Sequence, residues 1–464
     1  MIILGTNSIK DTGFNVANSL RFNDGSSDNL SRSTGTPSSR QKFTFSTWIK
    51  LSSVSGNRSI FNIETDGNTT LFFMVKNGDQ LHFVDYNSSA EQAKLTTNAL
   101  YRDPSAWMHV VLRLDSTQGT NTNRCRLYVN GSEVTSFSAT VYPSQNYNFT
   151  NNVGNTRIGV SQGNANYWDG YMAETVYCDN QSLAPDQFGE FDEDSGIWKP
   201  IDVSGLTFGD EGFYLDYENS GALGTDVSGE SNNFTVNNLT AIDQSTDTCT
   251  NNFATGNPLD NGCGKAPTFS EGNLKILHDN PSPVFSTIGV SSGKWYMEAK
   301  AISGNNDYQI GICSTQVTTN SDEIGLRAND WGYKASDGKY KNNGSDNSYG
   351  STYANGNIIG VYLDLDNNKL YFAKNGTIQN SGTGISITAP GSTPLGAYFF
   401  ALGANAANTK YTWEVNFGNP TYTGTDQTDA NGYGSFEYDP SAGTFDSASK
   451  DFYALNTKNL AEYG

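Results

Sequence analysis

Apolar and polar residues alternate in short runs along most of the chain, with a period of two. Clear runs are Phe43–Lys50 and Trp107–Asp115 in the first half and Lys294–Lys300 and Ile359–Asp366 in the second. Such alternation is the pattern of a β-strand with one buried face, and the Gly, Asn and Asp residues between runs are typical of turns. The pattern predicts an all-β protein.

The composition indicates that the chain folds, and its length indicates more than one domain. The 464 residues include 25 Tyr, 25 Phe and 7 Trp, although only 36% of residues are apolar. Aromatic side chains are bulky enough to fill sandwich cores, and a disordered chain would lack them. The length predicts two or three domains.

The stretch between Ser291 and Gly376 opens with Gly293–Lys300, passes through Trp331-Gly332-Tyr333 and ends in a hairpin signal at Asn375-Gly376. This order of motifs resembles a SPRY domain. The resemblance extends over roughly Phe269–Gly418. It implies a β-sandwich that presents loops to a partner, usually as a binding module.

The first half carries the motifs Trp107-Met-His-Val-Val, Leu127-Tyr-Val-Asn-Gly, Arg157-Ile-Gly and Trp168-Asp-Gly-Tyr-Met-Ala-Glu. Together they resemble a laminin-G/concanavalin-A-like jelly roll, the fold of many lectins. The expected fold is therefore all-β, with two β-sandwich (jelly-roll) domains. We expect an N-terminal arm (1–14), a laminin-G-like sandwich (15–195), a connector with short strands (196–267), a SPRY-like sandwich (268–420) and a C-terminal tail (421–464).

The tandem of the two domains also resembles surface proteins of marine tailed phages. There the same two domains recur with a linker like Asp226–Phe253 and a tail like Phe452–Leu460. The resemblance implies a tail fibre or similar virion appendage, a homo-oligomer (a trimer by analogy), contacts with other virion proteins and a location on the virion. Met1–Gly5 is too short for a signal peptide, so we expect synthesis in the host cytoplasm and release by lysis.

The net charge of −20 and the pI near 4.4 narrow the partners. An acidic surface repels phosphate backbones, so we expect no nucleic acid partner. No apolar run approaches the length that spans a bilayer, so we expect no membrane insertion.

Catalysis is not expected. Glycosidases on this fold need two carboxylates that face one cleft about 5 Å apart. The nearest approach to their motif, Glu190–Asp194, lacks the final Glu and lies in a turn-rich stretch, where a solvated acidic turn is the simpler interpretation. Nucleophile-elbow, zinc-protease and phosphate-loop motifs are also missing from the sequence.

Sugar binding is the better prediction, because sugar sites combine an aromatic face with Asn or Asp hydrogen bonds. Two stretches near strand ends, Asp85–Asn87 and Asn164–Asp169, supply such groups in the first domain. Trp168 is expected in the core. In the second domain Trp331 is expected in the core, and two tyrosines lie in loops that are expected to be exposed. The candidate ligand-binding residues are Asp85, Tyr86, Asn87, Tyr167, Asp169, Tyr340 and Tyr349.

No cofactor is expected, and the acidic loops leave a structural calcium open. Asp364–Asn368 superficially resembles a calcium loop but lacks the required Gly and Glu, and a hairpin turn is the simpler interpretation. Asn23–Asp28 and Asp226–Asn233 are weaker candidates. Among five irregularly spaced cysteines, Cys249 and Cys263 flank one loop and leave a disulfide open.

Three functions remain in order of preference. The first is a virion surface protein that binds the host envelope, through glycans. The second is a capsid decoration or tail adaptor protein that binds other virion proteins. The third is a bacterial lectin, which the missing signal peptide disfavours. A glycosidase ranks last.

Overall fold

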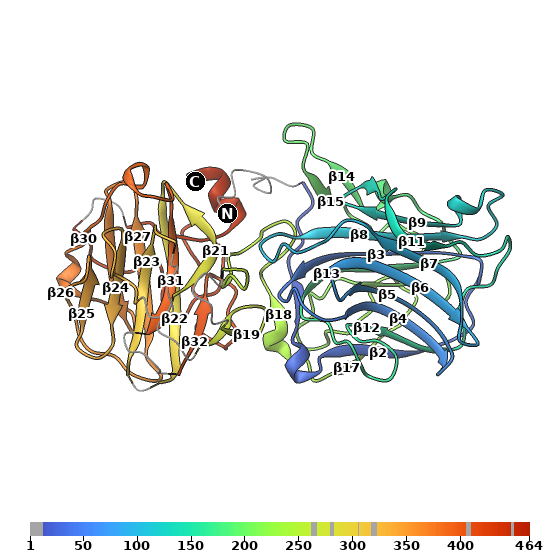
Figure 1. Ribbon diagram of the computed structural model, residues 1–464, viewed down its shortest axis with the longest axis horizontal. Coiled ribbons are helices and arrows are strands. Elements are labelled where there is room, and N and C mark those ends of the chain that lie inside the picture. Colours follow the sequence, from blue (N-terminus) through green and yellow to red (C-terminus); the bar gives the residue numbers. More distant parts are fainter. Residues whose placement is uncertain are drawn as a thin grey trace. The chain divides into compact units, whose positions relative to one another are not determined.

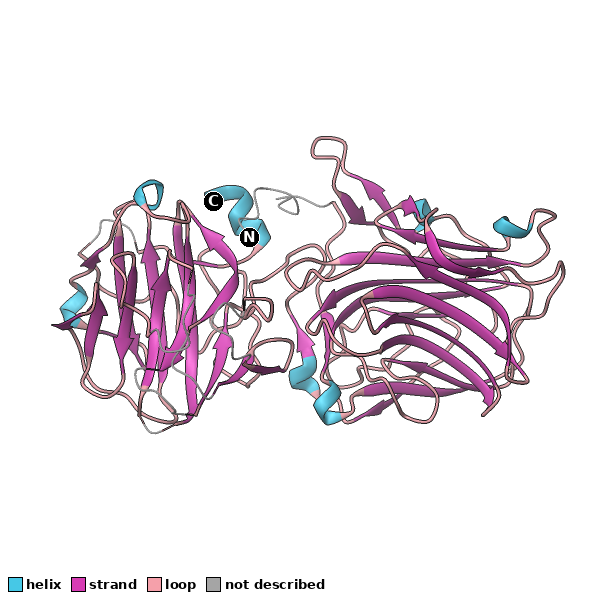
Figure 2. Cartoon of the chain, viewed as in Figure 1, coloured by secondary structure: helices cyan, strands magenta, loops and turns pink. Residues whose placement is uncertain are grey.

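The computed structural model describes residues 13–260, 267–278, 283–304, 306–316, 323–404, 410–446 and 450–464. The chain divides between Thr250 and Asn251 into two compact units, called here the N-terminal and C-terminal units. The regular secondary structure of both units is almost wholly β-strand (Figure 2). Each is a sandwich of two large sheets, which confirms the predicted fold class (Figure 1).

The N-terminal unit pairs two eight-stranded sheets, A and B. Sheet A has the order β10 (Ser132–Glu133), β9 (Cys125–Val129), β8 (Met108–Asp115), β3 (Lys42–Leu51), β13 (Gly170–Asp179), β1 (Ser19–Phe22) and β18 (Gln244–Ser245), and β16 (Phe213–Leu215) also pairs with β13. Sheet B has the order β11 (Phe137–Val141), β7 (Ala90–Thr97), β6 (Gln80–Asn87), β5 (Thr69–Lys76), β4 (Arg58–Asp66), β12 (Gly154–Ile158), β2 (Asn29–Thr34) and β17 (Thr235–Asn237).

Aromatic side chains fill the space between sheets A and B. Phe45 of β3 stacks on Phe61 of β4 with ring centroids 4.3 Å apart, and Phe73 of β5 meets Phe45 edge-on at 6.4 Å. All three side chains are fully buried. The alternating runs therefore form strands whose inward residues make one core, as the sequence pattern predicts.

The outer face of sheet A is covered by the chain itself. Val176 and Cys178 of β13 pack there with Phe188, Val203 and Phe208 from the segment that follows β13. This segment contains a hairpin of β14 (Gly189–Phe191) and β15 (Trp198–Pro200), in which Lys199 lies 3.4 Å from both Glu190 and Asp192. The acidic stretch after residue 189 thus forms a hairpin, and Lys199 pairs with two of its carboxylates.

The predicted connector contains short strands, and these strands complete the first sandwich. β16 pairs with β13, β17 pairs with β2, and β18 pairs with β1. Phe213 and Phe234 bury their rings in the core between sheets A and B. The stretch up to Thr250 therefore belongs to the N-terminal unit.

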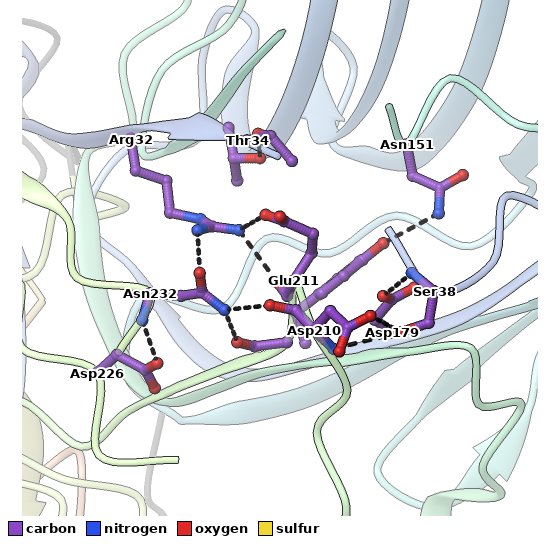
Figure 3. A network of polar contacts seen from close by, with 12 residues as sticks. Arg32, Thr34, Ser38, Asn151, Asp179, Asp210, Glu211, Asp226 and Asn232 are labelled. Atoms are coloured by element: carbon purple, nitrogen blue, oxygen red, sulfur yellow. Dashed lines mark hydrogen bonds and ion pairs between the residues drawn. The ribbon is translucent and has the colours of Figure 1, made fainter. Parts of the chain in front are cut away.

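A polar network fastens the same segment to sheet B. Figure 3 shows the Arg32 guanidinium of β2 pointing at Glu211 and Asn232. Nη2 of Arg32 lies 2.5 Å from Glu211 Oε2, and both side chains are nearly buried. Asp226 accepts hydrogen bonds from the backbone N–H groups of Tyr214 (2.9 Å) and Asn232 (2.7 Å). These contacts hold the segment 211–232 against the first sandwich.

The C-terminal unit pairs a nine-stranded sheet C with a six-stranded sheet D. Sheet C has the order β19 (Thr268–Ser270), β20 (Lys275–His278), β32 (Tyr411–Asn416), β22 (Lys294–Ser303), β27 (Ile358–Asp364), β28 (Lys369–Lys374) and β29 (Thr377–Ile378), with β30 (Ile385–Ser386) on β28 and β33 (Tyr453–Ala454) on β22. Sheet D has the order β21 (Val284–Val290), β31 (Tyr398–Ala404), β23 (Tyr308–Cys313), β24 (Asp330–Lys334), β25 (Lys339–Asn342) and β26 (Ser345–Ser348).

The core between sheets C and D is also aromatic. Trp295 and Trp413 are fully buried, and Trp331 is 4% exposed, as predicted for a core residue. Asp366–Asn368 forms the β27–β28 hairpin turn, which confirms that interpretation of the acidic loop.

The predicted tail is not a separate extension. Phe436, Phe445 and Phe452 pack with Tyr296 and Tyr362 on the outer face of sheet C. β33 then pairs in parallel with β22, and the short helix α1 (Thr457–Tyr463) follows. The tail supplies an extra layer to the second sandwich, because outward-facing tyrosines on β22 and β27 offer it apolar surface.

Short 3-10 helices occur in connections of both units. They are η1 (Asp24–Ser26), η2 (Asn121–Asn123), η3 (Pro185–Gln187), η4 (Ala241–Asp243), η5 (Asn380–Gly382) and η6 (Pro390–Ser392). Within the described ranges, no helix has the length and apolar character needed to cross a bilayer. Cys263 and nearly all of the predicted N-terminal arm lie outside the described residues.

Candidate functional site

The outer face of sheet B carries partly exposed aromatic side chains. On β5, Leu71 and Phe73 point into the core, so Thr70 and Phe72 lie on the outer face. On β6, Leu81 and Phe83 point inward, so His82, Val84 and Tyr86 face outward. The β5–β6 register places Phe72 opposite Val84 and Thr70 opposite Tyr86.

Three rings on this face lie next to one another, and we call Phe72, His82 and Tyr86 the aromatic row. The Phe72 ring centroid is 5.9 Å from that of His82 and 6.1 Å from that of Tyr86. All three side chains are half-buried, so each keeps part of its ring exposed. Aromatic rings with this partial exposure can contact the apolar face of a ligand.

Polar groups flank the aromatic row on its β4 side. Arg157 of β12 lies opposite Asn62 of β4, and Asn62 lies opposite Phe72. Arg157 Nη1 donates to Asn62 Oδ1 at 3.2 Å and pairs with Glu64 Oε2 at 2.5 Å. Asn62 Nδ2 donates to Thr70 Oγ1 at 2.8 Å. This linked set holds an amide, a guanidinium and a carboxylate beside Phe72.

A second polar set flanks the row on its β7 side. The Tyr86 hydroxyl donates to Glu91 Oε1 at 3.2 Å, and Lys94 Nζ lies 2.5 Å from Glu91 Oε2. Hydrogen bonding to Lys94 is the main cause that lowers the pKa of Glu91. Lys94 itself lies opposite Val84, so the ion pair runs along the edge of the ring row.

His82 is held as a neutral imidazole. Its Nδ1 lies 2.8 Å from Thr96 Oγ1. Burial, helped by the nearby charges of Lys76 and Lys94, lowers the pKa of His82 to about 4. Near neutral pH the imidazole therefore offers a hydrogen-bonding ring and no charge.

Three of the predicted ligand-binding residues, Asp85, Tyr86 and Asn87, end β6, and only Tyr86 of these lies on the outer face of sheet B. Asp85 points the opposite way, because neighbours on a strand alternate. Its side chain is fully buried, its Oδ2 accepts from the Thr150 N–H at 3.3 Å, and burial raises the pKa of Asp85 to about 7. Burial therefore argues against Asp85 as a ligand contact. Asn87 is exposed at the strand end, where Ser88 Oγ donates to it.

The second predicted stretch lies in the loop before β13. Tyr167 is half-buried, Asp169 is 9% exposed, and Trp168 is fully buried, as expected. The loop is bonded to the β4–β5 hairpin, since Ser59 N–H donates to Asn166 O (2.8 Å) and Gln162 Nε2 donates to Gly67 O (2.7 Å). Tyr167 therefore lies on a loop that is attached to sheet B, whereas burial argues against Asp169 as a ligand contact.

In the C-terminal unit the expectation for Tyr349 is wrong. Tyr349 is 9% exposed, and its hydroxyl accepts a hydrogen bond from the Phe372 N–H at 3.0 Å. Its ring packs edge-on against Tyr333 and Phe372, so it belongs to the core. Tyr340 is half-buried and packs against the same core.

Sequence reasoning missed Phe72, His82 and Arg157. Phe72 lies in the unbroken apolar run Leu71–Val75, so alternation could not say which of its residues faces outward. The usable signal was the spacing within each strand. Phe72 comes two residues after the polar Thr70, and Tyr86 comes four residues after His82, so each lies on the same face as that polar residue.

The C-terminal unit has a separate pocket of about 260 Å³. Phe285 of β21 and Phe399 of β31 form its apolar part with Leu395, and Asn257, Asp260 and Gln316 are among its polar lining. Asn257 N–H donates to Phe285 O at 2.8 Å, which fixes that wall to the edge of sheet D.

Metal-binding groups do not gather in the part of the chain that the structure describes: no three His, Cys, Asp or Glu side chains are placed to hold an ion. In the Asp226 loop the carboxylate accepts backbone N–H groups. In the β27–β28 turn, Asp364 accepts from Asn367 N–H at 3.0 Å and lies 3.3 Å from Lys294 Nζ.

Comparison with family models identifies a domain in each unit. Residues 24–182 match the model described as the concanavalin A-like lectin/glucanases superfamily, and residues 294–420 match the SPRY domain. The chain therefore contains a concanavalin-A-like domain of the laminin-G kind and a SPRY domain, as the motifs predict.

Known proteins resemble only parts of the chain. Ran-binding protein 9 of Xenopus tropicalis is 32% identical over 119 residues, which are 23% of this chain and 22% of that protein. The RNA helicase DDX1 of Xenopus laevis is 29% identical over 134 residues, or 29% and 16% of the two chains. The chain thus spans about a fifth of the length of the curated relatives it matches first.

Solved structures show similarly partial likeness. The SPRY domain of human HERC1 is 15% identical, with a TM-score of 0.25 over 31% of this chain and 87% of that one. The CBM40 module of Ruminococcus gnavus IT-sialidase is 16% identical, with a TM-score of 0.26 over 34% and 93% of the two chains.

Proposed function

We propose that this chain is a surface protein of a tailed-phage virion, a tail fibre or similar appendage, that binds glycans of the host envelope. The observation that carries the glycan part is the aromatic row of Phe72, His82 and Tyr86 on the outer face of sheet B. A sugar ring has an apolar face that stacks on aromatic rings and a rim of hydroxyls that need hydrogen-bond partners. Both kinds of group are present on this face.

The polar sets support binding rather than catalysis, and we propose that the protein is not an enzyme. The two carboxylates of the face are each paired with a base, Glu64 with Arg157 and Glu91 with Lys94. A glycosidase needs one carboxyl group that holds a proton near neutral pH. For Glu91, hydrogen bonding to Lys94 lowers the pKa and so favours the ionised form instead.

The virion part of the proposal rests on the resemblance of the tandem to marine tailed-phage proteins, down to the Phe452–Leu460 segment. From the same resemblance we propose a homo-oligomer, a trimer by analogy, that contacts other virion proteins and is located on the virion. The acidic charge supports the absence of a nucleic acid partner. We further propose no membrane insertion and no cofactor, with a structural calcium left to measurement.

The experiment for the glycan part is an array of bacterial surface glycans probed with the full chain and with Phe72→Ala. Loss of bound glycan in Phe72→Ala is the expected result. Phe191→Ala is the matched control, because Phe191 is 53% exposed but lies on β14, in the layer that covers sheet A. Equal binding by both variants and the parent chain would remove sheet B as the site.

The experiment for the virion part is antibody labelling of purified phage particles viewed by electron microscopy. Label on the tail or its fibres supports host recognition, and label over the head supports capsid decoration. Absence of label from every particle would contradict the virion proposal and favour a bacterial lectin.

A capsid decoration or tail adaptor that binds other virion proteins is the second candidate function. The pocket between Phe285, Phe399 and Leu395 favours it, because an apolar pocket with a polar rim can accept a side chain of a partner. Cross-linking in particles, with Phe399→Ser as the pocket variant, tests it: contacts with virion proteins that this variant abolishes support the adaptor function.

A further inference from the structure

The aromatic row is elongated in the direction of β6. His82 and Tyr86 lie on the same face of this strand, four residues apart, which corresponds to about 13 Å along an extended chain. Phe72, on the neighbouring strand, is opposite Val84, midway between them. Its ring centroid is nearly equidistant from the two, at 5.9 and 6.1 Å. The rings are therefore evenly spaced along a line and are not gathered around one point.

A single sugar ring could contact only part of such a line. Each step from one ring centroid to the next is close to the length of one pyranose residue in a chain. A ligand that uses all three rings must therefore extend along β6 for about three residues.

The charged groups beside the row are already paired. Arg157 is bound by Glu64 on one flank, and Lys94 by Glu91 on the other. His82 adds a neutral imidazole near pH 7. Unpaired charge would be needed to offset the desolvation of an anionic ligand. The centre of the face therefore suits hydroxyl groups better than carboxylates or sulfates.

Lys76 is the exception on this face. It follows Met74 on β5, so it points to the same side, and its charge acts on His82. Among the described residues, no carboxylate forms an ion pair with Lys76. Substitution of Lys76 therefore tests whether the bound ligand carries a negative charge.

Resting on the proposed glycan binding, we propose that sheet B binds an internal stretch of a linear, uncharged polysaccharide, with about three consecutive sugar residues aligned along β6. Phe72 contacts the central residue, and His82 and Tyr86 contact its two neighbours. The hydroxyls of the chain meet the partly exposed Arg157 and Glu64 on one side and Glu91 and Lys94 on the other.

The test measures affinity against chain length by titration calorimetry of the full chain. The probes are the array glycan that binds most strongly and its mono-, di-, tri- and tetrasaccharide fragments. We expect affinity to rise by about ten-fold for each added sugar that reaches a ring, and to level off after the trisaccharide. A monosaccharide that binds as tightly as the trisaccharide would overturn the proposal and leave glycan binding intact.

One variant at an end of the row and one at Lys76 sharpen this test. His82→Ala should lower affinity for the trisaccharide to that for the disaccharide while affinity for the monosaccharide stays unchanged. Lys76→Met should change nothing, whereas an anionic glycan that binds the parent chain and not Lys76→Met would overturn the uncharged class. If no array glycan binds the parent chain, the proposed function itself fails. Equal melting temperatures establish that each variant folds.

Discussion

The Glu298 carboxylate on β22 accepts a hydrogen bond from the backbone N–H of Glu437, 2.7 Å away. The contact links residues 139 positions apart and fixes the last part of the chain to sheet C. Asn416 Nδ2 (2.9 Å) and the Tyr422 hydroxyl (3.1 Å) donate to the same oxygen. Glu298 is fully buried, and burial is the main cause that raises its pKa.

Replacing this carboxyl should destabilise the C-terminal unit. Glu298→Ala leaves several buried donors without an acceptor, and the expected loss is about 3 kcal/mol in the free energy of unfolding. Glu298→Gln keeps the size and one acceptor, so its loss should be smaller. Urea denaturation of the C-terminal unit measures both, and an unchanged midpoint for Glu298→Ala would contradict the anchoring role.

The first domain should require residues beyond 195. A fragment that ends at 195 loses β16, β17 and β18 and exposes the core faces that Phe213 and Phe234 cover. We expect residues 13–250 to unfold cooperatively on heating and residues 13–195 to aggregate or to show no cooperative transition. Differential scanning calorimetry of the two fragments distinguishes them, and a cooperative transition in the shorter one would restore the predicted connector.

The Arg32–Glu211 pair should hold the completing segment in place. Arg32→Met leaves the Glu211 carboxylate, whose side chain is 11% exposed, without its partner, at an expected cost of about 3 kcal/mol. Hydrogen exchange should quicken across residues 209–234 and stay unchanged on β5 and β6. Arg126→Met is the control, because the Arg126–Glu133 pair is more exposed and should contribute little. Equal exchange in both variants would contradict the prediction.

Stability of the N-terminal unit should fall between about pH 4.5 and pH 8 because of Glu174. Burial raises the pKa of Glu174 to about 8, and its Oε2 accepts from the Tyr214 hydroxyl at 2.6 Å. The folded state therefore holds a proton that the unfolded state releases near pH 4.5. Its contribution to stability is full below that pH and is lost as pH rises toward 8.

Glu174→Gln should remove this loss, because an amide cannot ionise. We expect the variant to gain about 2–4 kcal/mol over the parent chain at pH 8 and little at pH 4.5. The difference between the two proteins isolates Glu174 from His109, a buried residue nearby whose pKa burial lowers to about 3. Urea midpoints at several pH values measure the effect, and a pH-independent difference would contradict it.

Sequence motifs were enough to place the two sandwiches but not their limits. Trp107–Asp115 and Ile359–Asp366 carry enough alternation to predict β8 and β27 nearly residue for residue. β17 and β18 have only three and two residues, too few for a period to emerge. Their pairing partners lie far away in the sequence, and only the folded sandwich reveals them.

The sequence by itself determined the secondary structure class, the order of the two domains and the core positions of Trp168 and Trp331, because alternation and local motifs depend on neighbours in the chain. The tertiary structure decided which face each residue occupies. Asp85 and Tyr86 are adjacent in the sequence, yet one is buried in the core and the other lies on the outer face of sheet B. Phe72 joins Tyr86 only because β5 and β6 pair in one register, and a shift of one residue would exchange the two faces.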